Sequence, residues 1–323
     1  MQIPPPGPKK QIMTNIYDLP VPLARALTPD RKIPVEGRFS VTQLIDAPLI
    51  RILVKRHFPE IDDDVSDSLW ALLGKAVHKI IEQGNEESET KIEVPFLGAT
   101  IVGIIDWHKD GHTIDWKITS VWSVVFSDGK TWEQQLQIYA WMLIADGKAV
   151  DKLSVYMILR DWNKRDAQKN PDYPRIPFHQ ISFSLWPKER IEAYIAERLS
   201  LHLRGDKIDP ALSDAEIPTD LWCSPEERWA KKNTWALKKN TNQRAVRVFD
   251  TEEAAGKALQ AATETAKKGD TYAIEFRKGG DTRCESYCSV AQWCPYYFPS
   301  WEKKNLLDKK VQECIVKLRG LKW

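Results

Sequence analysis

The sequence predicts an α/β protein, in which a mixed β-sheet flanked by helices precedes a cysteine-rich C-terminal region. Three observations predict this class. Between residues 40 and 160, apolar residues follow helical and then strand periods, in the order helix, helix, three strands, helix, strand. Asp110-Gly111 separates two of these strands as a tight turn. All five cysteines lie after residue 222, and clustered thiols in a reducing compartment indicate metal binding.

Composition places the chain among globular proteins. Its 323 residues are long for one domain and short for three, and 42% are hydrophobic, which suffices for a sizeable core. The net charge of +2 gives no argument for nucleic-acid binding, which would need local basic patches. The 14 tryptophans often neighbour Lys or Arg, a pattern that suits stacking on single-stranded bases, although most tryptophans in folded chains are buried.

The N-terminus indicates a cytoplasmic protein. The first seven residues, Met-Gln-Ile-Pro-Pro-Pro-Gly, lack the apolar segment of a signal peptide. No apolar run approaches the length of a membrane span. We therefore expect the chain in the cytoplasm, where thiols stay reduced.

Three regions follow one another along the chain. Residues 1–38 are Pro-rich and are expected to form an N-terminal arm. Residues 39–205 form the α/β core, and residues 206–323 form a C-terminal region that packs on it. The expected core elements are helices at 40–57, 67–83, 131–145 and 187–203 and strands at 91–97, 100–109, 112–119, 152–160 and 181–185. The C-terminal region is expected to hold a helix at 251–267 and a strand at 271–277.

The hairpin around Asp110-Gly111 carries the first sign of chemistry. A two-residue type I′ turn places Lys109 opposite His112 and Asp106 opposite Asp115. Two opposed carboxylates repel, and a divalent cation between them would reverse that interaction. Lys117, two residues beyond, would hold a water or a phosphate oxygen, as metal-dependent phosphodiester hydrolysis requires. From the hairpin alone, a solvated face with ordinary charges remains the alternative.

The helix expected at 67–83 has a wide apolar face. Gly74 lies within it at a cost of about 1 kcal/mol relative to alanine, and permits close approach of another backbone. His78 and Glu82 follow at intervals of one turn, so all three residues lie near one edge. A single histidine in a helix is usually structural, so this pattern has meaning only together with the hairpin.

Four short patterns now stand in order, and together they resemble the RecB-like branch of the PD-(D/E)XK nuclease superfamily. The patterns are Gly74-x-x-x-His78, Gly103-x-x-Asp106, Asp115-x-Lys117 and Gln135-x-x-x-Tyr139. Each is weak alone, but their order and their placement on helix, strand, strand and helix are specific. The resemblance covers about residues 40–160 and implies a restriction-endonuclease-like core. In layout it is nearest to phage-encoded members and to the cysteine-cluster CRISPR adaptation nucleases.

The resemblance implies a role for each matching residue. One or two Mg²⁺ or Mn²⁺ ions would be bound by the side chains of His78, Asp106 and Asp115 and the main-chain carbonyl of Trp116. The imidazole favours Mn²⁺ more than an all-oxygen site does. Lys117 would orient or help to deprotonate the attacking water. Gln135 and Tyr139 would position the scissile strand near the metals.

A second signature concerns the cysteines. RecB-like nucleases with an iron–sulfur cluster usually have one cysteine before the core and a Cys-x-x-Cys-x-x-x-x-x-Cys group after it. Here no cysteine precedes the core and the first gap is one residue longer, so the implied ligands are Cys223, Cys284, Cys288 and Cys294. Four thiolates fit a [4Fe–4S] cluster or, as the alternative, a tetrahedral structural Zn²⁺. Buried cysteines without a metal are the third reading.

The resemblance therefore implies a metal-dependent DNA exonuclease that leaves 5′-phosphate ends. Its expected substrate is a single-stranded end, in DNA recombination and repair or in phage DNA metabolism, within the host cytoplasm if a phage encodes it. A homo-oligomer or a recombination partner protein stays open. The alternatives are a non-catalytic DNA-binding or recombination partner that retains the fold, and a structural zinc protein with an incidental acidic hairpin.

Overall fold

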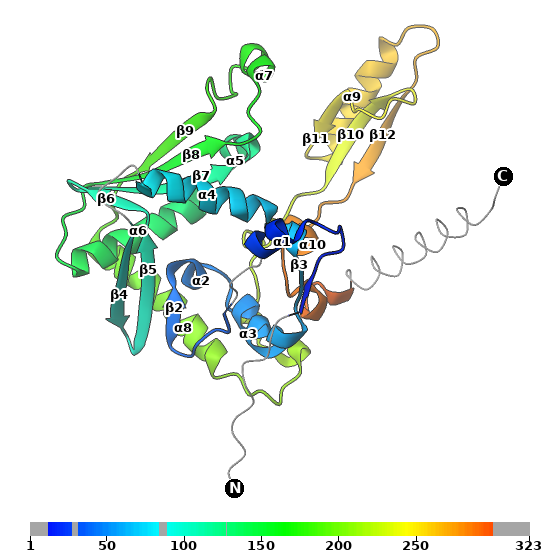
Figure 1. The fold of residues 1–323 in the computed structure, drawn as a ribbon. Helices are drawn as coiled ribbons and strands as arrows, with labels where there is room; N and C mark the ends of the chain where they lie inside the picture. Colours follow the sequence, from blue (N-terminus) through cyan, green and yellow to red (C-terminus); the bar gives the residue numbers. More distant parts are fainter. Residues whose placement is uncertain (1–11, 28–31, 84–88, 127, 300–323) are drawn as a thin grey trace. The chain divides into compact units, whose positions relative to one another are not determined.

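The computed structural model describes residues 12–27, 32–83, 89–126 and 128–299. The chain divides into two compact units, Met1–Trp222 and Cys223–Trp323 (Figure 1). The boundaries expected near residues 38 and 205 remain predictions. The basic tail beyond residue 299 lies outside the described residues.

The first unit is built from short strands and longer helices. Its strands are β1 (Ile12–Thr14), β2 (Arg38–Ser40), β3 (Asp62–Asp64), β4 (Thr90–Phe96), β5 (Ala99–Ile105), β6 (Trp107–Lys109), β7 (His112–Thr119), β8 (Lys152–Leu159) and β9 (Phe178–Phe183). Its α-helices are α1 (Val21–Leu27), α2 (Val41–Ile45), α3 (Pro48–His57), α4 (Leu69–Gln83), α5 (Val121–Phe126), α6 (Lys130–Ala145), α7 (Lys164–Lys169) and α8 (Lys188–Asp206). Its 3₁₀ turns are η1 (Phe58–Glu60), η2 (Val65–Ser68), η3 (Asp214–Glu216) and η4 (Thr219–Leu221).

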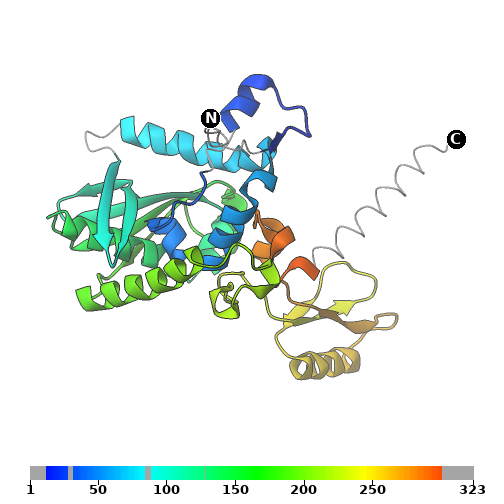
Figure 2. The ribbon, with the colours of Figure 1, turned by 90° about the horizontal axis from the view of Figure 1, so that it is seen from below.

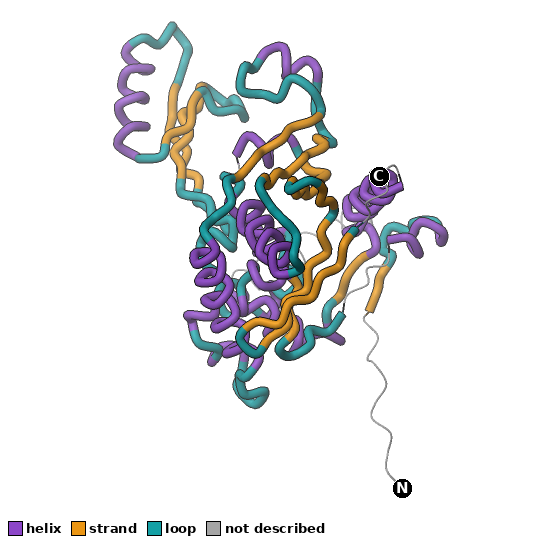
Figure 3. The backbone as a smooth tube through the Cα atoms, turned by 90° about the vertical axis from the view of Figure 1, so that its left-hand side faces the viewer, coloured by secondary structure: helices purple, strands orange, loops and turns teal. Residues whose placement is uncertain are grey.

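Two sheets form the centre of this unit. One has the strand order β2-β5-β4 and the other β6-β7-β8-β9. The second sheet is mixed, because β7 and β8 are parallel while the β6–β7 and β8–β9 pairs are antiparallel. A parallel pair needs a crossover, and α6 supplies it between β7 and β8. Helices lie on both sides of the strands (Figure 3), which confirms the predicted mixed α/β core.

Helix α6 is the centre of the hydrophobic core. Residues 135–143 are all buried. Leu136, Met142 and Leu143 join Leu153 and Val155 of β8 in one apolar cluster. A helix that is buried nearly all round is held in a single position. The polar side chains that α6 carries are therefore placed as firmly as its apolar ones.

The hairpin turn has the predicted type and register. Asp110 and Gly111 have φ angles of 47° and 75°, as both central residues of a type I′ turn require. Lys109 pairs with His112, and the ladder ends where Trp107 pairs with Ile114. The predicted strand 100–109 is divided, because β5 belongs to one sheet and β6 to the other. Asp106 lies at this break and is not ladder-paired with Asp115 as expected.

One expected helix is divided in the structure, and the apolar face of another is exposed. Ser40 caps α2 through a capping box with Gln43, but the helix ends at Ile45 and Pro48 begins α3. The residue before a proline is pushed out of the helical region, so the predicted helix 40–57 is two helices. The apolar face of α4 is not buried: none of its side chains is fully buried, and Ile80 is 67% exposed. Helical periodicity indicates which face is apolar, but only packing determines what covers it.

Part of the expected N-terminal arm is structured. Within the described residues, β1 pairs in parallel with β3, and the short helix α1 follows. The Thr14 hydroxyl donates to the Asp64 carboxylate at 2.9 Å, and the Ile16 N–H donates to the same oxygen. These hydrogen bonds connect the start of the described chain to the segment before α4.

The second unit contains a small sheet that the sequence patterns indicate only in part. Its elements are β10 (Thr234–Lys239), β11 (Arg247–Phe249), α9 (Glu252–Glu264), β12 (Tyr272–Arg277), α10 (Thr282–Ser286) and the 3₁₀ turn η5 (Ala291–Trp293). The strand order is β11-β10-β12, with antiparallel pairs, and the gold helix α9 lies along the strands (Figure 2). Helix α9 and strand β12 confirm the predicted elements, whereas β10 and β11 fall in a stretch whose sequence is irregular and basic.

Candidate active site

The residues of the four sequence patterns come from elements that surround the break between the two sheets. His78 lies on α4, and Asp106 lies between β5 and β6. Strand β7 carries Asp115, Trp116 and Lys117, and the buried helix α6 carries Gln135 and Tyr139. The structure therefore brings together side chains that are up to 61 positions apart in the sequence, counted from 78 to 139.

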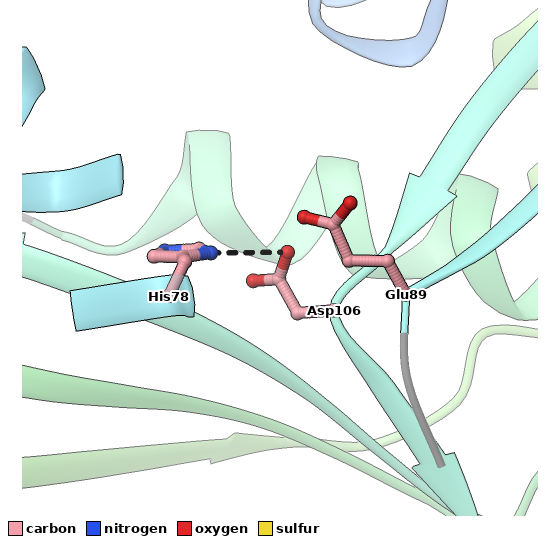
Figure 4. Close-up of side chains that lie close together, drawn as sticks. All are labelled: His78, Glu89 and Asp106. Atoms are coloured by element: carbon pink, nitrogen blue, oxygen red, sulfur yellow. Dashed lines mark ion pairs between the residues drawn. The ribbon is translucent and has the colours of Figure 1, made fainter. Parts of the chain in front are cut away.

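Three of the expected metal ligands are in direct contact. The Nδ1 atom of His78 lies 3.6 Å from Oδ1 of Asp106 (Figure 4). The Nε2 atom of His78 lies 3.1 Å from the main-chain oxygen of Trp116. The Trp116 N–H donates to Oδ2 of Asp106 at 2.8 Å. The imidazole thus lies between the carboxylate at one ring nitrogen and the carbonyl at the other, with Asp106 oriented by the backbone of β7.

Asp115 is engaged by a second set of side chains. It is only 3% exposed, and its Oδ1 accepts a hydrogen bond from Nε2 of Gln135 at 3.0 Å. Its Oδ2 lies 2.7 Å from Nζ of Lys117, as an ion pair. Gln135 also donates to the hydroxyl of Tyr139 at 3.0 Å and accepts from Lys117 at 3.4 Å. Lys117, Asp115, Gln135 and Tyr139 therefore form one continuous polar network, which we call the α6 network.

Of the two glycines in the sequence patterns, Gly103 has no room for a side chain, whereas Gly74 does. A Cβ on Gly103 would lie 2.9 Å from Sδ of Met142 and 3.2 Å from Cε1 of Tyr139, so the glycine allows α6 to approach β5. A Cβ on Gly74 would meet no described atom within 4 Å. The expectation that Gly74 permits a close backbone approach is therefore wrong for the part of the chain that the structure describes.

The electrostatics of the site suit a cation. Burial, and next the neighbouring Asp115, raise the pKa of Asp106 from 3.8 to about 6. The Trp116 N–H, His78 and Lys117 oppose this rise in the pKa of Asp106 without cancelling it. Burial and the Asp115 charge also raise the pKa of Tyr139, so its hydroxyl stays protonated and remains a donor. A divalent ion beside Asp106 would favour the ionised carboxylate.

One acidic residue of the site lies outside the sequence patterns and was not expected. Glu89 lies directly before β4, and ligand atoms of His78, Glu89 and Asp106 all lie within 4.8 Å of one another. Burial and the neighbouring Glu82 raise the pKa of Glu89. Its position between the α4 pattern and the hairpin, at the end of the acidic run Glu86-Glu87-Ser88-Glu89, is the one signal in the sequence that could have indicated it.

A divalent metal fits these residues by the chemistry of the donors. Carboxylate and carbonyl oxygens are the usual ligands of Mg²⁺ and Mn²⁺, and an imidazole is compatible with Mn²⁺. Asp115 is not among the three residues grouped within 4.8 Å. The two predicted acidic ligands are therefore near enough to repel each other but belong to different sets of contacts.

The four predicted cluster cysteines all lie in the second unit. Burial, and next Cys288 and Cys294, raise the pKa of Cys284 to about 12. Burial also raises the pKa of Cys223, and Cys294 and Cys288 contribute to that rise. The Lys231 N–H donates to the Gly280 carbonyl at 2.8 Å, so the segments that follow Cys223 and precede Cys284 run side by side. The fold thus brings the thiols of all four cysteines into one neighbourhood.

Four thiolates can bind a tetrahedral zinc or a [4Fe–4S] cluster, and these two groups require different spacings of the sulfurs. Ligands of a tetrahedral zinc with Zn–S bonds of ~2.3 Å lie roughly 3.8 Å apart. Among the residues that the structure describes, no three of the cysteine sulfurs fall within 4.8 Å of one another. In a [4Fe–4S] cluster each thiolate binds a different iron, which requires a wider spacing.

Comparison with known proteins identifies the family. The chain belongs to the PD-(D/E)XK nuclease superfamily, whose model matches residues 40–295. Members of this superfamily are nucleases that hydrolyse DNA and typically use Mg²⁺ or Mn²⁺. The match extends beyond the core and includes the four cysteines.

Two solved structures are similar at low identity. The crystal structure of SSO0001 is 19% identical, with a TM-score of 0.38, over 55% of this chain and 84% of that chain. The crystal structure of a phage related exonuclease from Haemophilus somnus 129PT is 18% identical, with a TM-score of 0.28, over 42% and 67%. No curated protein matches the chain. Within the described residues, no helix combines the length and apolar character needed to cross a membrane.

Proposed function

We propose that this nuclease is an exonuclease that acts on single-stranded DNA ends and leaves 5′-phosphate products. The observation that carries the proposal is that His78 contacts Asp106 and the Trp116 carbonyl through its two ring nitrogens, beside the Asp115–Lys117 ion pair. The exonuclease mode rests on the RecB-like order of the four sequence patterns. A role in DNA recombination or phage DNA metabolism belongs to the same proposal, as does a cytoplasmic location.

The proposed chemistry divides between the metal and the α6 network. The residues proposed to hold a divalent ion are His78, Asp106 and the Trp116 carbonyl, and such an ion would polarise the scissile phosphate and lower the pKa of a bound water. Asp115 either ligates the ion directly or positions Lys117 beside it. The Lys117 side chain is 30% exposed, so its ammonium group can meet a water on the open side of the site.

In this proposal Gln135 and Tyr139 have different roles. Gln135 donates to both Asp115 and Tyr139, so it orients the carboxylate that pairs with Lys117. Tyr139 keeps its proton and so offers a hydrogen-bond donor, which suits a phosphate oxygen of the scissile strand. Both residues are nearly buried, so their contact with DNA would be limited to a phosphate that enters the site.

We also propose that Cys223, Cys284, Cys288 and Cys294 bind a [4Fe–4S] cluster, with structural Zn²⁺ as the alternative. Cys288 and Cys294 contribute to the raised pKa of both Cys223 and Cys284, so the four thiols lie near one another, which supports a shared ligand. The sequence spacing of the four cysteines lacks the short pairs that structural zinc sites prefer, which favours iron and sulfur.

A non-catalytic DNA-binding protein is the second candidate function. Loss of an acidic ligand or of the lysine would favour it, but the chain retains both aspartates and Lys117. A homo-oligomer or a recombination partner protein would be compatible with either candidate.

Digestion of end-labelled single-stranded DNA in Mn²⁺ tests the proposal. Wild type is compared with Lys117→Ala and with the matched control Lys152→Ala, an exposed lysine on the neighbouring strand β8. We expect Lys117→Ala to lower the rate at least ~10²-fold and Lys152→Ala to change it less than ~3-fold. The label on one end identifies the polarity. Binding of DNA without cleavage by the wild type in Mn²⁺ would instead establish the non-catalytic candidate.

A further inference from the structure

We propose that Glu89 is a metal ligand of this site, and that it completes a cation position with His78 and Asp106. This inference rests on the proposed metal-dependent function, and it assigns a ligand outside the four sequence patterns. Glu89 and its neighbours are shown in Figure 4, where the carboxylates of Glu89 and Asp106 and the imidazole of His78 lie close together.

The distances suit a divalent ion after small side-chain adjustments. Ligand atoms of the three residues lie within 4.8 Å of one another. Oxygens on opposite sides of a Mg²⁺ ion lie about 4.2 Å apart, from two bonds of ~2.1 Å. Neighbouring ligands of the same ion lie about 3.0 Å apart, so the three side chains would draw closer together around a bound ion.

The contacts of Asp106 leave one oxygen directed to this position. Oδ2 of Asp106 accepts the Trp116 N–H, whereas Oδ1 is the atom nearest His78. Asp115 contacts Gln135 through one oxygen and Lys117 through the other, so its present contacts belong to the α6 network. Glu89 is the carboxylate that comes within 4.8 Å of ligand atoms of Asp106 and His78, from the residue directly before β4.

A cavity at this position has a negative lining. Its walls are formed by His78, Ile81, Glu82, Glu89, Asp106, Trp107 and Trp116. Glu82 is paired with Lys79 at 3.1 Å and lies outside the group of three ligand atoms. Three carboxylates around one small cavity repel one another, and a divalent cation would make each of these interactions favourable.

Mn²⁺ binding by the full-length protein, stripped with EDTA, tests the inference. Electron paramagnetic resonance of unbound Mn²⁺ gives the affinity without reference to nuclease activity. Glu89→Gln removes the ligand charge and keeps the shape of the side chain. Glu82→Gln is the matched control, because it removes the same charge from the same cavity without removing a proposed ligand. Circular dichroism confirms that both variants are folded.

We expect Glu89→Gln to weaken Mn²⁺ binding at least ~10-fold and Glu82→Gln to weaken it less than ~3-fold. Equal affinities of Glu89→Gln and wild type would overturn the inference. Equal losses in both variants would also overturn it, because the effect would then be one of charge rather than ligation.

Asp106→Asn separates this inference from the proposed function. If Asp106→Asn abolishes Mn²⁺ binding and digestion while Glu89→Gln leaves Mn²⁺ affinity unchanged, the nuclease proposal stands and the role of Glu89 fails. If the wild type neither binds Mn²⁺ nor digests DNA, the proposed function fails first, and the role of Glu89 with it.

Discussion

Replacing Asp106 by asparagine should stabilise the metal-free protein above pH 6. The pKa of Asp106 rises from 3.8 to about 6 because the carboxyl is buried and faces Asp115. The folded protein therefore holds the proton of this group more tightly than the unfolded chain does. Wild-type stability consequently falls as the pH rises from about 4 to about 6, and remains lower above that range.

The magnitude of the expected stability change follows from the size of the rise in the pKa of Asp106. A pKa difference between 3.8 and about 6 corresponds to about 3 kcal/mol at pH 8, since each pH unit is worth ~1.4 kcal/mol. The Asp106 side chain is 14% exposed, so solvent screening leaves most of this value. Asparagine retains an oxygen that accepts the Trp116 N–H. We therefore expect Asp106→Asn to gain about 2–3 kcal/mol at pH 8, but only ~0.5 kcal/mol at pH 4.

Urea unfolding in EDTA at pH 8 and pH 4 measures the effect. Burial lowers the pKa of His202 to about 4, so His202 makes the fold less stable as the pH falls from 6.5 to 4. That contribution is present in both proteins and cancels in the difference. A variant less stable than wild type at pH 8, or a gain that does not shrink at pH 4, would refute the reasoning. Added Mn²⁺ should stabilise wild type but not the variant.

Two further predictions concern the turn and the cysteines. Gly111→Ala should destabilise the protein by about 1–3 kcal/mol in urea unfolding, because φ is 75° and a Cβ would lie 2.3 Å from Oδ2 of Asp151; a change below ~0.5 kcal/mol would contradict the turn geometry. Protein purified without oxygen should contain about four irons per chain and absorb visible light, and Cys288→Ser should lose both properties. Zinc in place of iron in the wild type would identify the alternative cofactor.

The local patterns of the sequence were sufficient to predict the hairpin and the order of the core elements. Asp110 and Gly111 determine the turn type of the hairpin, because both residues adopt positive φ angles. The turn then determines the register of the two strands as far as Trp107 and Ile114. Period-two alternation was likewise sufficient to predict β7, and a short apolar run was sufficient to predict β8 as a buried strand. The candidate site residues on these elements can therefore be named from the sequence, although their roles remain proposals.

Tertiary packing alone decided three other features. The break at Asp106 arises because β5 and β6 join different sheets, which no alternation pattern in one strand reveals. The exposure of α4 depends on what packs against its apolar face, and periodicity does not report a partner. Glu89 reaches His78 and Asp106 through space, from a segment with no motif of its own.

One physical reason explains why some features follow from the sequence and others only from the tertiary structure. Turn type and strand alternation are set by steric interactions between residues a few positions apart, so the sequence by itself determines them. The metal position depends on where α4, the β5–β6 break and the start of β4 meet, which is set by burial of α6 against the sheets. Hydrophobic burial is non-directional, so only the folded structure decided that Glu89 lies with His78 and Asp106 in one group of ligand atoms within 4.8 Å.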